Sequence, residues 1–409
     1  MLTLDKIYQA SFVLKNVLHT TEPIYAPLLC PGCELYLKPE NLQVTGSFKV
    51  RGAYFKMSQL SPEEKAAGVI ACSAGNHAQG VALAARENGI KAQICIPEGA
   101  PISKVEATKS YGAEVVLVKG VYDDAYAKAI ELQKEQGSTF IHPYDDEDVI
   151  AGQGTIGLEL MNQLSDIDAV IVPIGGGGLI SGVAYAVKSL NPKVKVYGVQ
   201  AAGAPSMIDS IKEGRQLTLP GVSTFADGIA VKHPGDLTYE IVSKYVDELV
   251  TVTDDEIATA ILALIERHKM IAEGAGAVAV AAAMFGKVDI KGKKAVCVVS
   301  GGNIDVTILS RVISRGLMKE GRSTDITVAL VDKPGQLVAV SELIARTGAN
   351  VVSVRHDRSD EDMDINSCFL RLGMETRDRD HVEEIKRVLR DAGYQIVEGV
   401  AGVTGGTVR

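Results

Sequence analysis

The chain has 409 residues, enough for two or three domains of ordinary size. Its formal net charge is −9 and no basic cluster stands out, which argues against a nucleic-acid partner. No apolar run approaches the roughly 20 residues of a membrane span, and the first residues lack a signal-peptide core, so we expect a cytoplasmic protein without a membrane partner.

The N-terminal region predicts a helix and then a strand. Apolar residues recur at helical spacing from Leu4 to Val13, and a strand is expected over 34–38. Between them, Cys30 and Cys33 form a CxxC pair. Zinc is disfavoured because the sequence has no second ligand pair, and redox chemistry because the pair precedes a strand. We interpret the pair as a turn.

Lys49 stands at the centre of the run NLQVTGSFKVRGA, residues 41–53. A helix is expected from Phe48 to about Leu60, so Lys49 would lie in the first turn, where backbone N–H groups and the helix dipole are positive. This setting favours the free amine that Schiff-base chemistry requires. The alternative is a solvated surface lysine, the commoner role at a helix start.

Short apolar strands then alternate with helical segments. The strands are expected over 68–72, 92–96, 114–118, 139–141, 169–173 and 194–200. Strands that are apolar throughout, rather than at every second residue, predict an α/β fold with parallel sheet covered on both faces. The pattern loosens after Gln200 and returns at 248–251, followed by a capping box, Thr253 to Glu256, that opens a helix to about His268.

Gly175–Gly178 follow one strand and open a helix, with Leu179 next. Consecutive glycines let the backbone wrap closely around an anion, with N–H groups at the positive helix end as donors. A dinucleotide site is the alternative. It is disfavoured because the run is not G-x-G-x-x-G and because Gln200 stands where an acidic residue would be expected.

Two further segments follow apolar strands. Ser73-Ala74-Gly75-Asn76-His77 lies between a strand and a helix, and Ser300 follows the strand 295–299 ahead of a last helix to about Lys319. Read alone, each segment could simply cap the helix after it.

Residues 1–320 form the larger predicted domain. After the linker 321–324, residues 325–409 have a different order of predicted strands and helices and form a second domain. The expected order of elements is strand, helix, strand, strand, helix, strand, which is ferredoxin-like.

Together, the Lys49 segment, the glycine run and Ser300-Gly-Gly-Asn303 resemble the threonine dehydratase (threonine ammonia-lyase) branch of the fold-type II, tryptophan synthase β-like, pyridoxal-phosphate enzymes. Residues 20–320 carry this resemblance. Residues 325–398 resemble an ACT domain, through Asp332–Leu337 and Gly348–Asn350. The resemblance implies a two-lobed, parallel-sheet catalytic unit that binds pyridoxal 5'-phosphate, followed by a domain that senses an amino acid.

Residue roles follow from the same resemblance. Lys49 would hold the cofactor and act as catalytic base. The substrate carboxylate would lie on Ser73, Ala74, Gly75, Asn76 and His77. The residues implied to bind the cofactor are Phe48, Lys49, Asn76, Gly175, Gly176, Gly177, Gly178, Leu179 and Ser300. The implied reaction converts L-threonine to 2-oxobutanoate and ammonia, and L-serine to pyruvate, in a pathway that feeds isoleucine synthesis.

Several alternatives stay open. Serine racemases of the same fold carry a serine where this chain has Ala74, which disfavours racemisation. A silent amino-acid sensor is disfavoured by the intact Lys49 segment. Some relatives bind a cation through a glutamate where Gln200 stands, so a metal site stays unknown. Isoleucine or valine is the expected effector, held by Gly335 and Asn350, in a homodimer or homotetramer.

Overall fold

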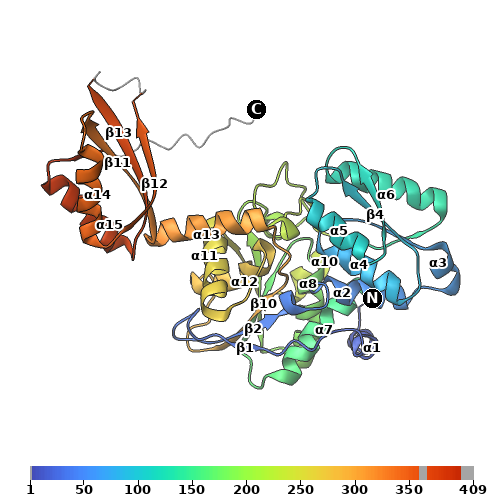
Figure 1. Cartoon of the computed structure of the whole chain (residues 1–409). Helices are drawn as coiled ribbons and strands as arrows, with labels where there is room; N and C mark the ends of the chain where they lie inside the picture. The colour runs from blue at the N-terminus through green and yellow to red at the C-terminus, as the bar shows by residue number, and fades with distance from the viewer. Residues whose placement is uncertain (1, 359–365, 398–409) are drawn as a thin grey trace. The chain divides into compact units, whose positions relative to one another are not determined.

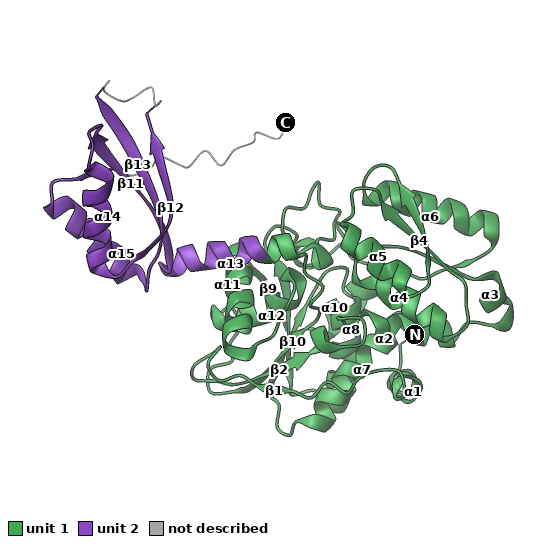
Figure 2. Cartoon of the chain, viewed as in Figure 1, with its two compact units in different colours: residues 1–309 green, residues 310–409 purple. Residues whose placement is uncertain are grey.

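The computed structural model describes residues 2–358 and 366–397. The chain forms two compact units, residues 1–309 and 310–409 (Figures 1 and 2). The boundary lies within helix α13 (Val306–Glu320), about ten residues before the expected linker, because this helix begins in one unit and ends in the other. In the part of the chain that the structure describes, no helix is long and apolar enough to cross a membrane.

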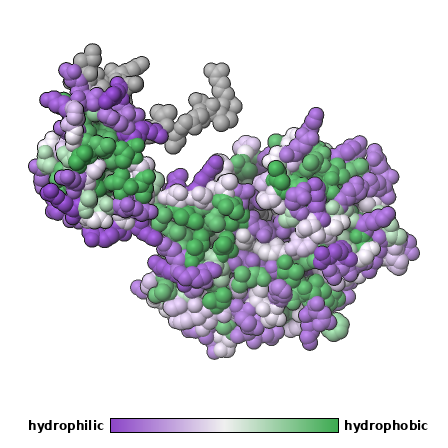
Figure 3. Space-filling model, in the orientation of Figure 1, coloured by the Kyte–Doolittle hydropathy of each residue, from purple (hydrophilic) through white to green (hydrophobic). Residues whose placement is uncertain are grey.

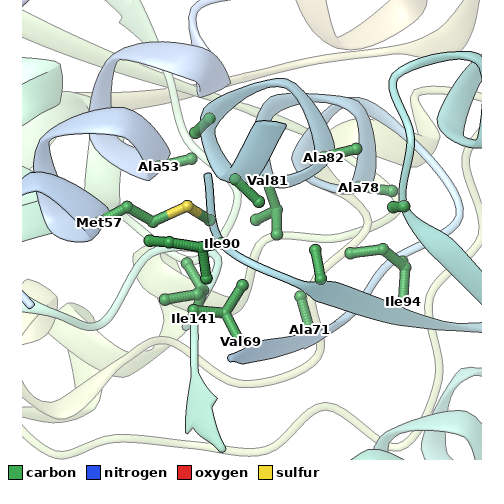
Figure 4. Packing of buried hydrophobic residues seen from close by; sticks show 14 of the residues in the cluster. Ala53, Met57, Val69, Ala71, Ala78, Val81, Ala82, Ile90, Ile94 and Ile141 are labelled. Atoms are coloured by element: carbon green, nitrogen blue, oxygen red, sulfur yellow. The ribbon is translucent and has the colours of Figure 1, made fainter. Parts of the chain in front are cut away.

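The first unit contains a small parallel sheet that forms its own lobe. In spatial order its strands are β5 (Glu114–Val118), β4 (Ala92–Pro97), β3 (Val69–Cys72) and β6 (Thr139–Phe140). Helices α4 (Asn76–Glu87), α5 (Ile102–Ser110) and α6 (Tyr122–Gln136) connect them. Alanines on α4, including Ala78 and Ala82, pack with Val69 and Ile94 (Figure 4), so the helix approaches the sheet closely.

The larger sheet of the first unit has six strands. In spatial order they are β1 (Ile24–Tyr25), β2 (Glu34–Pro39), β10 (Lys294–Val299), β7 (Ala169–Pro173), β8 (Lys195–Ala201) and β9 (Glu248–Val252). All neighbouring pairs are parallel except β1 with β2. The pairing of Pro39 with Val299 brings the segment that leads to Lys49 beside the strand that leads to Ser300.

Helices cover this sheet and join the lobes. They are α1 (Leu4–Leu14), α2 (Lys49–Ser58), α7 (Glu147–Gln163), α8 (Gly178–Leu190), α9 (Ser206–Glu213), α10 (Asp236–Tyr245), α11 (Asp254–Ala263) and α12 (Gly274–Met284), whereas α3 (Pro62–Ala67) leads into β3 of the small sheet. The predicted capping box is confirmed, since Thr253 and Glu256 exchange hydrogen bonds at the start of α11. α3, α9 and α10 were not predicted, because their short apolar patterns lie among glycines and prolines.

The second unit has the predicted ferredoxin-like order. Its elements are β11 (Ser323–Val331), α14 (Gln336–Thr347), β12 (Asn350–Asp357), β13 (Ser367–Glu375), α15 (Arg379–Asp391) and β14 (Gln395–Val397). They form an antiparallel sheet in the order β12-β13-β11-β14. Its core includes Val328, Val340, Ile344, Leu370 and Ile385. The sequence also predicts a charged loop over 356–362, but β12 continues to Asp357, and the expected loop beyond Arg358 lies outside the described residues.

Candidate active site

One cavity of the first unit brings the separated motifs together. Its volume is about 640 Å³, and it lies where strands β3, β7 and β10 end. The carboxyl ends of parallel strands are the usual place for a ligand in α/β sheets. Every residue that the sequence assigned to cofactor or substrate lines this cavity: Phe48, Lys49, Ser73, Ala74, Gly75, Asn76, His77, Gly175, Gly176, Gly177, Gly178, Leu179 and Ser300.

Lys49 lies in the first turn of α2, as predicted, although the helix begins at Lys49 itself and not at Phe48. Its Nζ donates to the carbonyl oxygen of Pro143 at 2.7 Å and lies 5.3 Å from the centroid of the Phe48 ring. Burial lowers the pKa of the amine to about 8, while attraction to the Glu273 carboxylate acts in the opposite direction. In the folded protein, desolvation rather than the helix end is the largest cause of the lowered pKa of Lys49.

This lowered pKa makes a testable prediction. In the cofactor-free protein, acylation of Lys49 should rise between pH 7 and 9 and then level off, because about half of its amine is neutral at pH 8. Lys56 of the same helix is the control: despite its desolvation, the hydrogen bonds that it donates to Asp146 and Asp148 raise its pKa, so its acylation should still rise above pH 10. Peptide mass spectrometry measures both. Parallel pH profiles for the two lysines would contradict the assignment.

The glycine run occupies tightly packed space at the start of α8. Gly177 has φ +101°, which favours glycine, and a Cβ there would lie 2.7 Å from Thr238. A Cβ on Gly176 would lie 2.5 Å from the ring of Tyr144. The first N–H groups of α8, at Gly178 and Leu179, have no acceptor within the helix and are available to an anion.

The loop after β3 leaves open space beside the cavity. The N–H of Gly75 donates to Ser73 Oγ at 3.1 Å, and a Cβ on Gly75 would meet no protein atom within 4 Å. Packing therefore does not require this glycine. The buried His77 ring lies 2.8 Å from the Ile141 carbonyl oxygen, through Nε2. Burial lowers the pKa of His77 to about 3, so the ring is neutral at pH 7.

Hydrogen bonds to other segments hold the side chains of Asn76 and Ser300. Asn76 Nδ2 donates to Glu273 Oε1 at 2.5 Å, and Asn76 Oδ1 accepts from Asn303 Nδ2 at 2.8 Å. Ser300 is buried, and its Oγ donates to the Ala275 carbonyl oxygen at 3.3 Å. Ser300 does not cap the helix that follows it in the sequence, since that helix, α13, begins only at Val306.

Two other motifs have structural roles. Cys33 Sγ donates to the carbonyl oxygen of Cys30 at 3.2 Å, and burial raises the pKa of the Cys33 thiol to about 12, so the turn interpretation is supported. Gln200 Oε1 accepts from the backbone N–H of Ile208 at 3.0 Å. Among the described residues, one group could hold a metal, Asp332, His356 and Cys368, in the second unit, and Asp332 is already paired with Arg358 at 2.9 Å.

Sequence reasoning missed three residues of the site. Glu273 and Tyr144 line the cavity, and Asn303 contacts Asn76. Asn303 belongs to the motif that was singled out for its serine, so a signal for it existed. Tyr144 follows a two-residue strand, and no pattern in the sequence pointed to it. Glu273 begins a stretch of small residues, 273–278, and its neighbours in the sequence give no sign of a site residue.

Known proteins are similar to this chain along nearly its whole length. Residues 20–301 match the model of the family described as "Pyridoxal-phosphate dependent enzyme". The L-threonine ammonia-lyase of Thermotoga maritima is 54% identical over 398 residues, which are 97% of this chain and 99% of that protein. The catabolic L-threonine dehydratase of Escherichia coli K12 is 53% identical over 285 residues, 69% of this chain and 86% of its own length.

Solved structures are similar to about three quarters of the chain. The processed form of threonine deaminase isoform 2 from Solanum lycopersicum matches with a TM-score of 0.72 and 41% identity, over 76% of this chain and 93% of its own. The maize serine racemase matches with a TM-score of 0.73 and 36% identity, over 78% of this chain and 98% of its own.

Proposed function

Because the chain belongs to the pyridoxal-phosphate-dependent enzyme family, we propose that it is an L-threonine ammonia-lyase. The single observation that carries the proposal is the cavity, which is lined by a half-buried lysine of lowered pKa, the glycine loop and a buried serine. The identity of 54% with a protein of that name, over nearly both full lengths, supports the substrate.

The residues present fit pyridoxal phosphate. Lys49 offers an amine inside the cavity, and the start of α8 offers backbone N–H donors for a phosphate. The hydroxyl of Ser300 would hydrogen-bond to the pyridine nitrogen, and Phe48 and Asn76 would contact the ring. When bound, pyridoxal phosphate withdraws electrons from the substrate, so that the proton on Cα becomes acidic.

Residues of the chain would then orient the substrate and remove its Cα proton. Backbone N–H groups of the loop after β3, such as those of Ala74 and Asn76, would orient the substrate carboxylate, and the neutral Nζ of Lys49 would take the Cα proton as a base. The β-hydroxyl leaves as water, and hydrolysis of the released enamine uses one water. The balance is therefore L-threonine to 2-oxobutanoate plus ammonia.

The direct test is product analysis with L-threonine and L-serine. We expect 2-oxobutanoate from threonine and pyruvate from serine, each with one equivalent of ammonia. A protein that binds pyridoxal phosphate yet forms no 2-oxo acid from either substrate would contradict the proposal.

Serine racemase is the second candidate, and the similarity to the maize structure favours it. Ala74 argues against it, because a methyl group in the cavity wall cannot return a proton to Cα. Chiral analysis of unreacted L-serine separates the two functions. D-serine formation comparable to pyruvate formation would favour the racemase.

We also propose that the second unit binds an amino-acid effector such as isoleucine or valine. Gly335, with φ +89°, caps α14, whose first N–H groups suit a carboxylate. Asn350 pairs with Glu375, which also pairs with Ser323 at the far end of β11 from Gly335. The nine residues of β11 span about 25 Å, so Asn350 of the same copy does not reach a ligand at Gly335.

Truncation tests this regulation. The chain ending at Arg322 should keep threonine deamination and lose its response to isoleucine and valine, while the full chain should change its KM or kcat with one of them. The coupling expected for such control is about 5- to 150-fold in affinity. A full-length enzyme insensitive to both amino acids would contradict the effector assignment.

We propose a homo-oligomer that uses the second unit. Strand β12 is an edge strand and exposes the apolar side chains of Val352 and Val354. The visible face of this unit also carries apolar residues (Figure 3). Exposed apolar edge strands tend to pair with another chain. Truncation at Arg322 should therefore also reduce the number of copies per oligomer, which light scattering gives as the measured molar mass divided by that of one chain.

A further inference from the structure

The proposed reaction uses none of the acidic residues that line the cavity, Asp123, Asp227 and Glu273, and of these three only Glu273 is buried. Glu273 is 4% exposed and lines the cavity at the start of α12. It stands at the N-cap position of that helix, yet its side chain makes no capping hydrogen bond. Its Oε1 instead accepts from Asn76 Nδ2 at 2.5 Å. The carboxyl group therefore accepts a hydrogen bond from Asn76 instead of capping its own helix.

Asn303 decides which end of the Asn76 amide points to Glu273. Asn303 Nδ2 donates to the Thr45 carbonyl oxygen at 2.8 Å and to Asn76 Oδ1 at 2.8 Å, so its two hydrogens are both used. Asn76 must present its oxygen to Asn303 and hence its nitrogen to Glu273. One Nδ2 hydrogen of Asn76 is then left without an acceptor among the described residues, in a side chain that lines the cavity.

The charges around Glu273 do not require it to be ionised. Burial raises the pKa of Glu273 to about 7, with repulsion from Asp227 adding to the effect and Lys104 and Lys49 opposing it. Lys104 pairs with Asp227 at 2.6 Å. Near pH 7 the carboxyl group is thus about half protonated. Its hydrogen bond to Asn76 depends on an acceptor oxygen at that place rather than on a full charge.

We propose that Glu273 is a positioning residue that holds the Nδ2 end of the Asn76 amide while Asn303 holds its Oδ1 end, and so directs an Asn76 N–H donor at an oxygen of the bound cofactor. The inference rests on the proposed cofactor site. Gly301 leaves room for this contact, because a Cβ there would lie 2.4 Å from Glu273 Oε1. The set of Glu273, Asn76, Asn303 and the Thr45 carbonyl links the segments before α2, α12 and α13 to the first residue of α4.

Two near-isosteric variants separate positioning from packing. Glu273→Gln keeps an acceptor oxygen, whereas Glu273→Met keeps the volume without one. We expect Glu273→Met to weaken the affinity for pyridoxal phosphate about tenfold, as expected when a donor in the site is lost, and Glu273→Gln to stay within about twofold of wild type. Cofactor-free protein titrated with pyridoxal phosphate and followed by absorbance gives the affinity, and thermal unfolding without cofactor reports the fold.

The Asn76→Ala background provides the decisive comparison. There Glu273→Met should have no further effect on the affinity, because the side chain it positions is gone. An undiminished effect in that background, or equal effects of Gln and Met, would overturn the proposal. If Glu273→Met does not fold, Glu273→Asp, which withdraws the carboxyl by one carbon, is measured with the same expectation. A wild type that does not bind pyridoxal phosphate would refute the proposed function instead.

Discussion

Replacement of Lys49 by alanine is expected to lower threonine deamination at least about 10³-fold, because it removes both the amine that holds the cofactor and the proposed base. The visible absorbance of the purified protein should disappear with the activity. Borohydride reduction of the wild type, followed by peptide mapping, should place the cofactor label on Lys49.

Lys56→Ala is the matched control for this experiment. Lys56 lies on the same helix, α2, but its Nζ pairs with Asp146 at 2.8 Å and Asp148 at 3.1 Å, and it does not line the cavity. This variant should keep its absorbance and most of its activity. A label found on another lysine, or a Lys49→Ala protein with substantial activity, would disprove the role of Lys49.

Replacement of Arg51 by methionine is expected to cost about 3–5 kcal/mol of unfolding free energy. Arg51 is fully buried on α2, and its guanidinium donates to Glu40 at 2.7 and 2.8 Å and to Glu159 at 2.5 Å. Its loss would leave the buried Glu40 carboxylate with Thr21 as a hydrogen-bonding partner, at 2.7 Å. Denaturant unfolding of the purified variant measures the change.

Two further variants test the cause of this loss. Arg86→Met removes an exposed cation paired with Glu87 at 2.8 Å, and its effect should stay within about 1 kcal/mol. Adding Glu40→Gln to Arg51→Met should recover part of the stability, because it removes the uncompensated charge. An Arg51→Met protein as stable as wild type would show that the ion pairs do not hold α2 in place.

The local parts of the site could be predicted from the sequence because each depends on neighbouring residues. A lysine after Gly46-Ser47, glycines between a strand and a helix, and the capping box at Thr253 leave signals within a few positions. The same holds for the element order of the second unit, where strands and helices alternate at distinct periods. The boundary between the units lay within a continuous helix, which local patterns do not reveal.

Several contacts could not be predicted, because they join distant segments. Glu273 reaches Asn76, which is 197 positions away, and Tyr144 packs on Gly176. Asn350 was expected near Gly335, but strand pairing places the two at opposite ends of β11. No spacing along the chain encodes which loops meet at a sheet edge.

The sequence by itself determined the elements and the chemical groups available: an amine at a helix start, glycine loops with free N–H groups, and a serine after a buried strand. Only the tertiary structure decided how those groups act. The pairing of β2 with β10 brings the segment before Lys49 beside Ser300. Burial in the shared cavity, more than the helix end, lowers the pKa of Lys49, since desolvation depends on everything that packs around the amine.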